Sequence, residues 1–323
     1  MRTPTYLSPT SVSKWYDDRD GFYLKYLADN KIPKEPQTQP MSIGSAFDAY
    51  VKSYLTQKLF GTDKGFELEQ ILCDQVEPHN RDWARVQGEY VFNCYKDSGC
   101  LAALMRELGQ AQEEPQFEMR IERNVSHETS QTVVNLMGYP DIYFISKEGK
   151  PIVYDWKVNG YCGKARTTPT QGYIKLVDGW KGEQSRAHNK SHKNAVMMYD
   201  QGIRYNCAQP LHTVQQSWAN QTIAYGWMLG MPIGGDFIIG IDQITKYDGE
   251  PGNFPKLRIA THRSKADPKY QMQFFAQVCH VWESIKSGHI FDDVSRKKSD
   301  DRCLLLDNYY KAKNDDAFQD LLK

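Results

Sequence analysis

Runs in which apolar and other residues alternate predict a β-hairpin in the middle of the chain. Residues 142–146 and 151–158 are rich in aromatic and β-branched residues, and residues 147–150 between them have the glycine and charged residues typical of a turn. Side chains point alternately to the two faces of a strand, so one apolar set is expected to face the core. That set consists of Ile152, Tyr154, Trp156 and Val158.

Apolar residues spaced three and four positions apart predict helices on both sides of this hairpin. The clearest helix covers residues 41–58. Its core face is formed by Phe47, Tyr50, Val51 and Tyr54. Asp48 lies about 100° around the helix from Phe47, at the edge of that face, and can either reach a functional site or face the solvent. Three other segments are expected to be helical: residues 61–112, 214–229 and 270–285.

Further alternating runs predict the rest of a sheet. Residues 116–124 predict one strand that leads into the hairpin, and residues 132–137 are expected to continue the same sheet. Glu118 and Glu122 lie on the first of these strands. Either could approach the polar face of the hairpin, but the register is open and neither is named as a ligand. Two later strands are expected at residues 237–241 and 256–261.

This order of elements is typical of an α/β fold with a central mixed β-sheet flanked by helices. The chain has 323 residues, of which 40% are hydrophobic and 25% charged, as is ordinary for a globular protein. We expect a single domain over residues 1–323, with a core at about 41–290 and a peripheral C-terminal tail at about 295–323.

Composition excludes several classes of protein. No apolar run approaches the length of a membrane-spanning helix, and the N-terminus lacks the apolar stretch of a signal peptide, so we expect a cytoplasmic protein with no membrane partner. The seven cysteines are odd in number and include no Cys-x-x-Cys pair, which argues against a disulfide framework or a zinc ribbon. Residues 160–165 lack the spacing and the Ser or Thr of a Walker A loop, so no ATP is expected.

A long basic segment at about residues 158–206 interrupts this pattern. The net charge of the whole chain is zero, so any nucleic-acid-binding surface must be local, and this segment has eight Lys or Arg residues against three Asp or Glu. Interleaved aromatic residues favour an ordered insertion that binds a phosphate backbone, although a solvated charged loop is the alternative. The candidate DNA-binding residues are Lys164, Arg166, Arg186, Lys190 and Lys193.

Two acids and a lysine are the candidate catalytic residues. Asp141 directly precedes the first hairpin strand, and Asp155 and Lys157 share one face of the second. Paired carboxylates suit a hard divalent cation such as Mg²⁺, and a lysine beside it can hold a water molecule or offset charge on a phosphate. Taken alone, the same pattern is also typical of a turn followed by a solvated ion pair.

Four motifs follow one another on the expected helix, hairpin and helix. They are Gly44-Ser45-Ala46-Phe47-Asp48, Gly138-Tyr139-Pro140-Asp141, Asp155-Trp156-Lys157 and Gln221-x-x-x-Tyr225. In this order they resemble the PD-(D/E)xK nuclease superfamily, and within it the RecB-like branch that includes the λ-type phage exonucleases. The resemblance covers residues 8 to about 245 and implies a restriction-endonuclease-like core.

The resemblance also implies a role for each motif residue. Asp141 and Asp155 would bind the metal with the backbone carbonyl of Trp156, and Lys157 would position the attacking water. Gln221 and Tyr225 would contact DNA near the scissile phosphate. The branch often has His where this chain has Asp48; a carboxylate there would still bind Mg²⁺, or Mn²⁺ in its place, so the number of metal ions stays open. Cys279 and Cys303 lie too far apart for the iron–sulfur cluster of some members.

The function implied by the resemblance is a Mg²⁺-dependent exonuclease that degrades linear double-stranded DNA from an end, in recombination, repair or host DNA degradation. Its 5′-to-3′ direction, a single-strand annealing partner, assembly into a homo-oligomeric ring and a host-cytoplasmic location for a phage protein are likewise implied. Two alternatives stay open. A structure-specific endonuclease would use the same metal site, and a catalytically inactive nucleic-acid-binding module would keep the fold alone.

Overall fold

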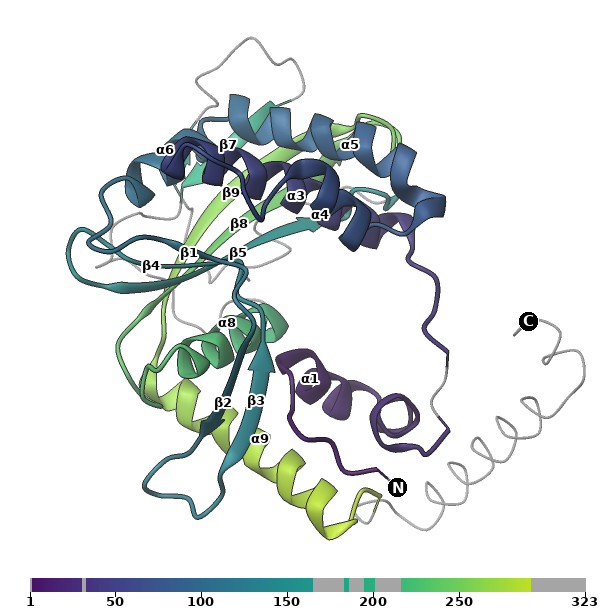
Figure 1. Cartoon of the computed structure of the whole chain (residues 1–323), viewed down its shortest axis with the longest axis vertical. Helices are drawn as coiled ribbons and strands as arrows, with labels where there is room; N and C mark the ends of the chain where they lie inside the picture. Colours follow the sequence, from purple (N-terminus) through teal and green to yellow (C-terminus); the bar gives the residue numbers. More distant parts are fainter. Residues whose placement is uncertain (1, 31–32, 165–182, 186–194, 201–215, 292–323) are drawn as a thin grey trace, which may run out of the picture.

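A computed structural model of the chain describes residues 2–30, 33–164, 183–185, 195–200 and 216–291 (Figure 1). Its centre is a seven-stranded mixed β-sheet, in which β5 pairs with β8 and β7 with β9 in parallel, and the other neighbours are antiparallel. In spatial order the strands are β1 (Gln116–Phe117), β4 (Ile142–Ile145), β5 (Pro151–Asn159), β8 (Ile238–Asp248), β9 (Lys256–Lys265), β7 (Ala195–Asp200) and β6 (Glu183–Ser185).

Helices cover both faces of this sheet, which confirms the expected α/β architecture with a mixed sheet flanked by helices (Figure 1). One layer consists of α3 (Gln39–Phe60), α4 (Leu68–Gln75), α5 (Pro78–Asp97) and α6 (Cys100–Leu108). The other side carries α8 (Gln216–Met228), α9 (Pro268–Ser287) and the N-terminal segment α1 (Pro9–Asp17), α2 (Arg19–Phe22) and η1 (Tyr23–Leu27). Among the described residues, none of the helices is both long and apolar enough to cross a membrane.

The predicted hairpin is confirmed as β4 and β5, with Gly149 at a positive φ of 75° in the turn. Both faces of β5 are buried, because helices cover both sides of the sheet. Tyr154 and Trp156 pack with the α3–α5 layer, as expected, while Val153 packs with the α8–α9 side. The face that carries Asp155 is therefore a second core face rather than a solvated one.

The prediction of one strand over residues 116–124 is wrong. The strand is interrupted at Glu118, which has a positive φ of 41°. As a result, β1 joins the large sheet and β2 (Ile121–Val125) does not. Strand β2 instead pairs with β3 (Val134–Gly138) in a separate two-stranded sheet. Alternation alone could not predict this break, because the apolar pattern continues on both sides of it.

The basic segment at about 158–206 is also corrected in part. Strand β5 continues to Asn159, and β6 and β7, which lie within the segment, join the edge of the large sheet beside β9. Part of the predicted insertion is therefore part of the sheet. The expected tail at 295–323 lies outside the described residues.

Close helix packing depends on one glycine. Gly88 of α5 faces Ala46 of α3, and a Cβ atom added at Gly88 would lie 2.6 Å from the Ala46 Cβ and 3.1 Å from its backbone carbonyl carbon. Neither atom belongs to a flexible side chain that could move away. The closest contact between α3 and α5 therefore requires the absence of a side chain at position 88.

We expect Gly88→Ala to lower the free energy of unfolding by about 1–3 kcal/mol, because the extra methyl group forces the two helices apart. The matched control is Gly44→Ala in α3, where an added Cβ has no neighbour within 4 Å. That substitution should raise the stability by roughly 0.5–1 kcal/mol, since alanine favours a helix over glycine. Urea unfolding of both variants measures the difference, and equal effects would contradict the packing argument.

Candidate active site

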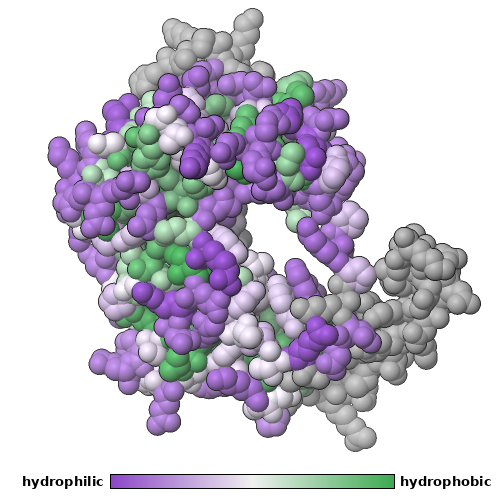
Figure 2. All heavy atoms as spheres, viewed as in Figure 1, coloured by the Kyte–Doolittle hydropathy of each residue, from purple (hydrophilic) through white to green (hydrophobic). Residues whose placement is uncertain are grey.

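A cleft of about 300 Å³ lies where α3, β5 and α8 converge. These elements border the opening that Figure 2 shows between the α3–α5 layer and the N-terminal segment. The rim of that opening is mainly hydrophilic (Figure 2). The polar residues that line the cleft are Ser45, Asp48, Lys52, Gln75, Glu118, Asp141, Asp155, Lys157 and Gln221.

Helix α3 brings an acid and a lysine into the cleft from one turn of its surface. The Lys52 Nζ atom lies 2.6 Å from Asp48 Oδ2, 3.1 Å from Glu118 Oε2 and 3.3 Å from Asp141 Oδ1. The side chain of Lys52 is only 1% exposed. A single buried ammonium group thus connects three carboxylates from three separate segments. Asp48, placed by the sequence at the edge of the helix face, reaches the site.

Asp141 directly precedes β4 and lies beside the part of β5 with which β4 does not pair. Strand β4 begins at Ile142, paired with Tyr154, so among the described strands β5 has no neighbour on that side beyond Tyr154. The backbone N–H of Trp156 donates to Asp141 Oδ2 at 3.1 Å. The backbone carbonyl of Asp141 accepts from the N–H of Glu118, also at 3.1 Å. The end of β4 therefore holds this carboxylate against the backbone of β5.

Strand alternation places Asp155 and Lys157 on the same face of β5, as predicted. Asp155 is 4% exposed, and its Oδ2 atom lies 2.5 Å from the Lys157 Nζ atom. Lys157 also donates to Gln221 Oε1 of α8 at 3.0 Å. On the opposite face of the strand, the indole N–H of Trp156 donates to the hydroxyl group of Tyr95 at 3.4 Å, which fixes the orientation of the strand.

Helix α8 completes the cleft, and the two residues of its predicted motif share one face. Gln221 Nε2 donates to the hydroxyl group of Tyr225 at 2.8 Å. The ring of Tyr225 lies against Gly138, where an added Cβ would be 2.5 Å from its Cε1 atom. The glycine of the second motif therefore has a structural role, because it lets α8 approach β3 closely.

Glu118 belongs to the site, and Glu122 does not. The break at Glu118 turns its carboxylate towards Lys52, and Gln75 Nε2 donates to its Oε1 atom at 3.0 Å. Glu122 lies on β2, where it pairs with Arg120 at 2.9 Å, away from the residues that line the cleft. The register that the sequence left open is thus resolved by the change of sheet between the two residues.

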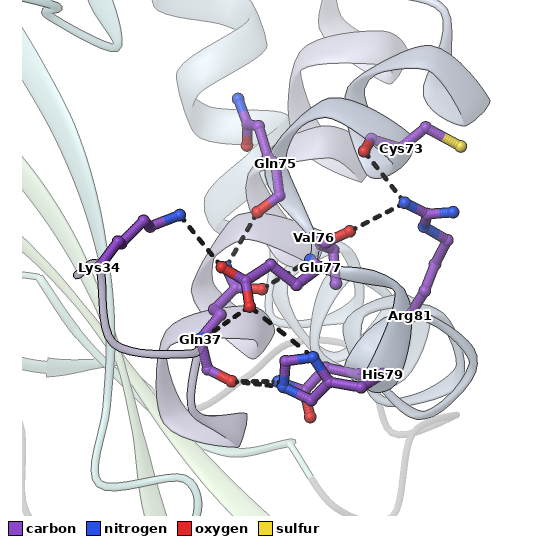
Figure 3. A network of polar contacts seen from close by, with 9 residues as sticks. Lys34, Gln37, Cys73, Gln75, Val76, Glu77, His79 and Arg81 are labelled. Carbon is purple, nitrogen blue, oxygen red and sulfur yellow. Dashed lines mark hydrogen bonds and ion pairs between the residues drawn. The ribbon is translucent and has the colours of Figure 1, made fainter. Parts of the chain in front are cut away.

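Gln75 is held by a network at the corner between α4 and α5 (Figure 3). Residues 33–38 lead from the N-terminal segment to α3, and Gln37 in this linker exchanges hydrogen bonds with Glu77 at 2.8 and 2.9 Å. Its side chain also donates to the backbone carbonyl of Gln75 at 2.9 Å. Lys34 adds an ion pair with Glu77 at 3.1 Å. The linker is therefore fixed to the corner that supports Glu118.

Burial and mutual repulsion set the charges of the cluster. Burial raises the pKa of Asp48 to about 7, although Lys52 favours its charged form. Burial also raises the pKa of Asp155 well above its ordinary value. Burial opposes the charge of Asp141 as well, but Lys52 and a hydrogen bond from Asp155 outweigh it and lower the pKa of Asp141 to about 2. The lysines of the cluster therefore do not keep all of its carboxylates ionised.

The donor chemistry of the cluster fits a hard divalent cation. Its donor atoms are carboxylate oxygens. Among the described residues, the buried Oδ1 atom of Asp48 has no hydrogen-bond partner, and the Oδ2 atom of Asp155 has its ion pair with Lys157 alone. In the described part of the chain, no three His, Cys, Asp or Glu side chains surround a common point as a metal site. The ammonium groups of Lys52 and Lys157 lie between the carboxylates instead.

The predicted DNA-binding residues have different outcomes. Gln221 and Tyr225 lie at the cleft or directly beside it. Lys164 is exposed after a turn, does not line the cleft, and accepts a hydrogen bond from Lys246 Nζ at its backbone carbonyl. The other predicted residues lie outside the described residues: Arg166, Arg186, Lys190 and Lys193.

Sequence reasoning missed Lys52 and Gln75. A signal for Lys52 was present, because it follows Asp48 by four positions and so lies on the same side of α3. A lysine beside the apolar residues of a helix face suggests a buried charge with partners. Gln75 carries no such signal, since its contact with Glu118 depends on the corner between α4 and α5.

Comparisons with known proteins add little to this geometry. No protein-family model matches the chain, and no curated protein matches it. A solved structure described as the crystal structure of SSO0001 aligns with 89% of this chain and 95% of its own, at 10% sequence identity and a TM-score of 0.28. A likeness this weak carries no argument about fold or function.

The raised pKa of Asp48 predicts that Mg²⁺ binding depends on pH. A proton and a metal ion compete for the same carboxylate, so below a pKa of about 7 each bound ion must displace a proton. We expect the Kd for Mg²⁺ to fall by roughly tenfold or more between about pH 6 and pH 8. Isothermal titration calorimetry measures it, and Asp48→Asn should weaken this dependence. An unchanged pH profile in that variant would contradict the role of Asp48.

Proposed function

We propose that this protein is a metal-dependent deoxyribonuclease with a PD-(D/E)xK core. One observation carries the proposal: residues from four separate sequence motifs converge on one cleft. Asp48, Asp141, Asp155, Lys157 and Gln221 all line it, although up to 173 positions separate them in the sequence. A solvated ion pair, the alternative for the isolated motif, would not explain a carboxylate as deeply buried as Asp155.

The carboxylates and the lysine would divide the work of phosphodiester hydrolysis. Asp141 and Asp155, with the carbonyl oxygen of Trp156 and with Asp48 beside them, would hold Mg²⁺, or Mn²⁺ in its place. When bound, such an ion would activate a water molecule and polarise the phosphate. Lys157 would orient the attacking water and offset the charge that develops on the phosphate oxygens. In the reaction the water oxygen would form a bond to phosphorus and release a proton to the solvent, while the bond to the leaving oxygen would break and that oxygen would take up a proton.

The side of the cleft formed by α8 would hold the nucleic acid. The hydrogen bond from Lys157 to Gln221 fixes the amide of Gln221 beside the reacting group, and Tyr225 supports that amide through its hydroxyl group. An amide in this position can donate to a phosphate oxygen without adding charge. The basic segment at about 158–206 would bind the phosphate backbone of the same substrate.

Linear double-stranded DNA with a free end is the substrate that we propose, since the motif order resembles the λ-type enzymes. Digestion in the 5′-to-3′ direction, a single-strand annealing partner and a homo-oligomeric assembly belong to the same proposal. An endonuclease that acts on particular DNA structures would need no different metal site, because the bond that it breaks is the same. The form of the substrate therefore distinguishes these possibilities.

The test uses one plasmid, supplied covalently closed and linearised, with Mg²⁺. We expect wild-type protein to degrade the linear form alone, and Asp155→Asn to reduce the rate by a hundredfold or more, roughly the loss of a metal ligand. Nicking of the closed form would identify an endonuclease. Binding to DNA without cleavage of either form, in Mg²⁺ and in Mn²⁺, would overturn the catalytic proposal in favour of a binding module.

Two glutamates four positions apart provide a matched pair for the same assay. Glu118→Gln should lower the rate of cleavage roughly tenfold or more, because it removes a carboxylate that supports the cluster. Glu122→Gln is the control, since Glu122 pairs with Arg120 on β2 and is not among the residues that line the cleft. Its rate should equal that of the wild type. Equal losses in both variants would contradict this location of the site.

A further inference from the structure

Lys52 is a buried cation at the centre of the acidic cluster, and the proposed chemistry does not use it. Its three ion pairs join α3, the break at Glu118 and the end of β4, within 2.6 to 3.3 Å of its Nζ atom. An ammonium group has three N–H donors, so three carboxylates can satisfy it fully. Lys52 contributes to the cleft lining, but at 1% exposure its side chain is unsuited to direct contact with DNA.

The formal charges of the cluster limit how many further cations it can hold. When all of these groups are charged, four carboxylates and two lysines give a net charge of two negative units: Asp48, Glu118, Asp141 and Asp155 against Lys52 and Lys157. One divalent cation would neutralise the remainder. A second divalent cation would leave an excess of positive charge in a buried site, which is unfavourable unless other anions accompany it.

The two lysines of the cluster differ in their burial and in their partners. Lys157 is partly exposed, belongs to the cleft and pairs with Asp155 and Gln221. Lys52 is buried, comes from the other layer and pairs with Asp48, Glu118 and Asp141. Among the described residues, the side of the cluster near Asp155 is therefore the one without a fixed buried cation.

From this arrangement we propose that Lys52 is a positioning residue that takes the place of a second metal ion, so that the site binds a single divalent cation at Asp141, Asp155 and the Oδ1 atom of Asp48 that does not pair with Lys52. This inference rests on the proposed function, because it concerns the same carboxylates. It explains the presence of an aspartate at position 48, because this carboxylate pairs with a lysine one helical turn later. Lys52 then holds three carboxylates in place whether or not the divalent cation is bound.

The number of bound ions tests this inference. Mn²⁺ is titrated into the full-length protein without DNA, and the free ion is followed by electron paramagnetic resonance. We expect one Mn²⁺ per wild-type chain and one per chain of Lys52→Arg, which keeps the cation. Lys52→Met should bind two, because it exposes three carboxylates to a second ion. Its melting temperature should also rise more on addition of Mn²⁺ than that of the wild type.

The matched control is Lys157→Met, which removes the same charge from the other side of the cluster and should still bind one ion. Two ions in both methionine variants would mean that net charge alone sets the number, which overturns the role of Lys52. Two ions in the wild type would overturn it whether or not Lys52→Met folds, while leaving the nuclease proposal intact. No bound ion in the wild type would instead overturn the proposed metal-dependent function itself.

Discussion

The ion pairs of Lys52 are the interaction on which the site depends. Burying an ammonium group is unfavourable unless carboxylates surround it, and here they come from α3, from the break after β1 and from the end of β4. The charge that stabilises Lys52 therefore fixes three segments relative to one another. The acidic cleft and the position of α3 beside β5 both depend on this interaction.

Close packing on either side keeps these charges in position. The contact between Gly88 and Ala46 holds α3 against α5, and the contact between Gly138 and Tyr225 holds α8 against β3. Each contact allows two elements to approach more closely than a side chain would permit. The cleft therefore lies between helices from opposite layers, and Lys157 lies where no described strand pairs with β5 on the β4 side.

Local pattern was sufficient to predict much of this arrangement. The hairpin, the helix that carries Asp48 and the shared face of Gln221 and Tyr225 all follow from periods of two or 3.6 residues. The pairing of β2 with β3 did not follow, because a single residue with positive φ at Glu118 redirects a strand whose alternation continues. Lys52 was missed since its environment is formed by segments distant in sequence. Pattern identifies which residues share a face, whereas the partners of a buried charge depend on the tertiary fold.

The linker at residues 33–38 has a consequence for the acidic cluster. It is bound at Gln37 to the α4–α5 corner and connects the N-terminal segment to α3, on one border of the opening seen in Figure 2. Loss of these hydrogen bonds would release the linker from the corner, although the peptide chain would still join the two segments. Because the corner also carries Gln75, which donates to Glu118, a displacement of the linker would be transmitted to the acidic cluster.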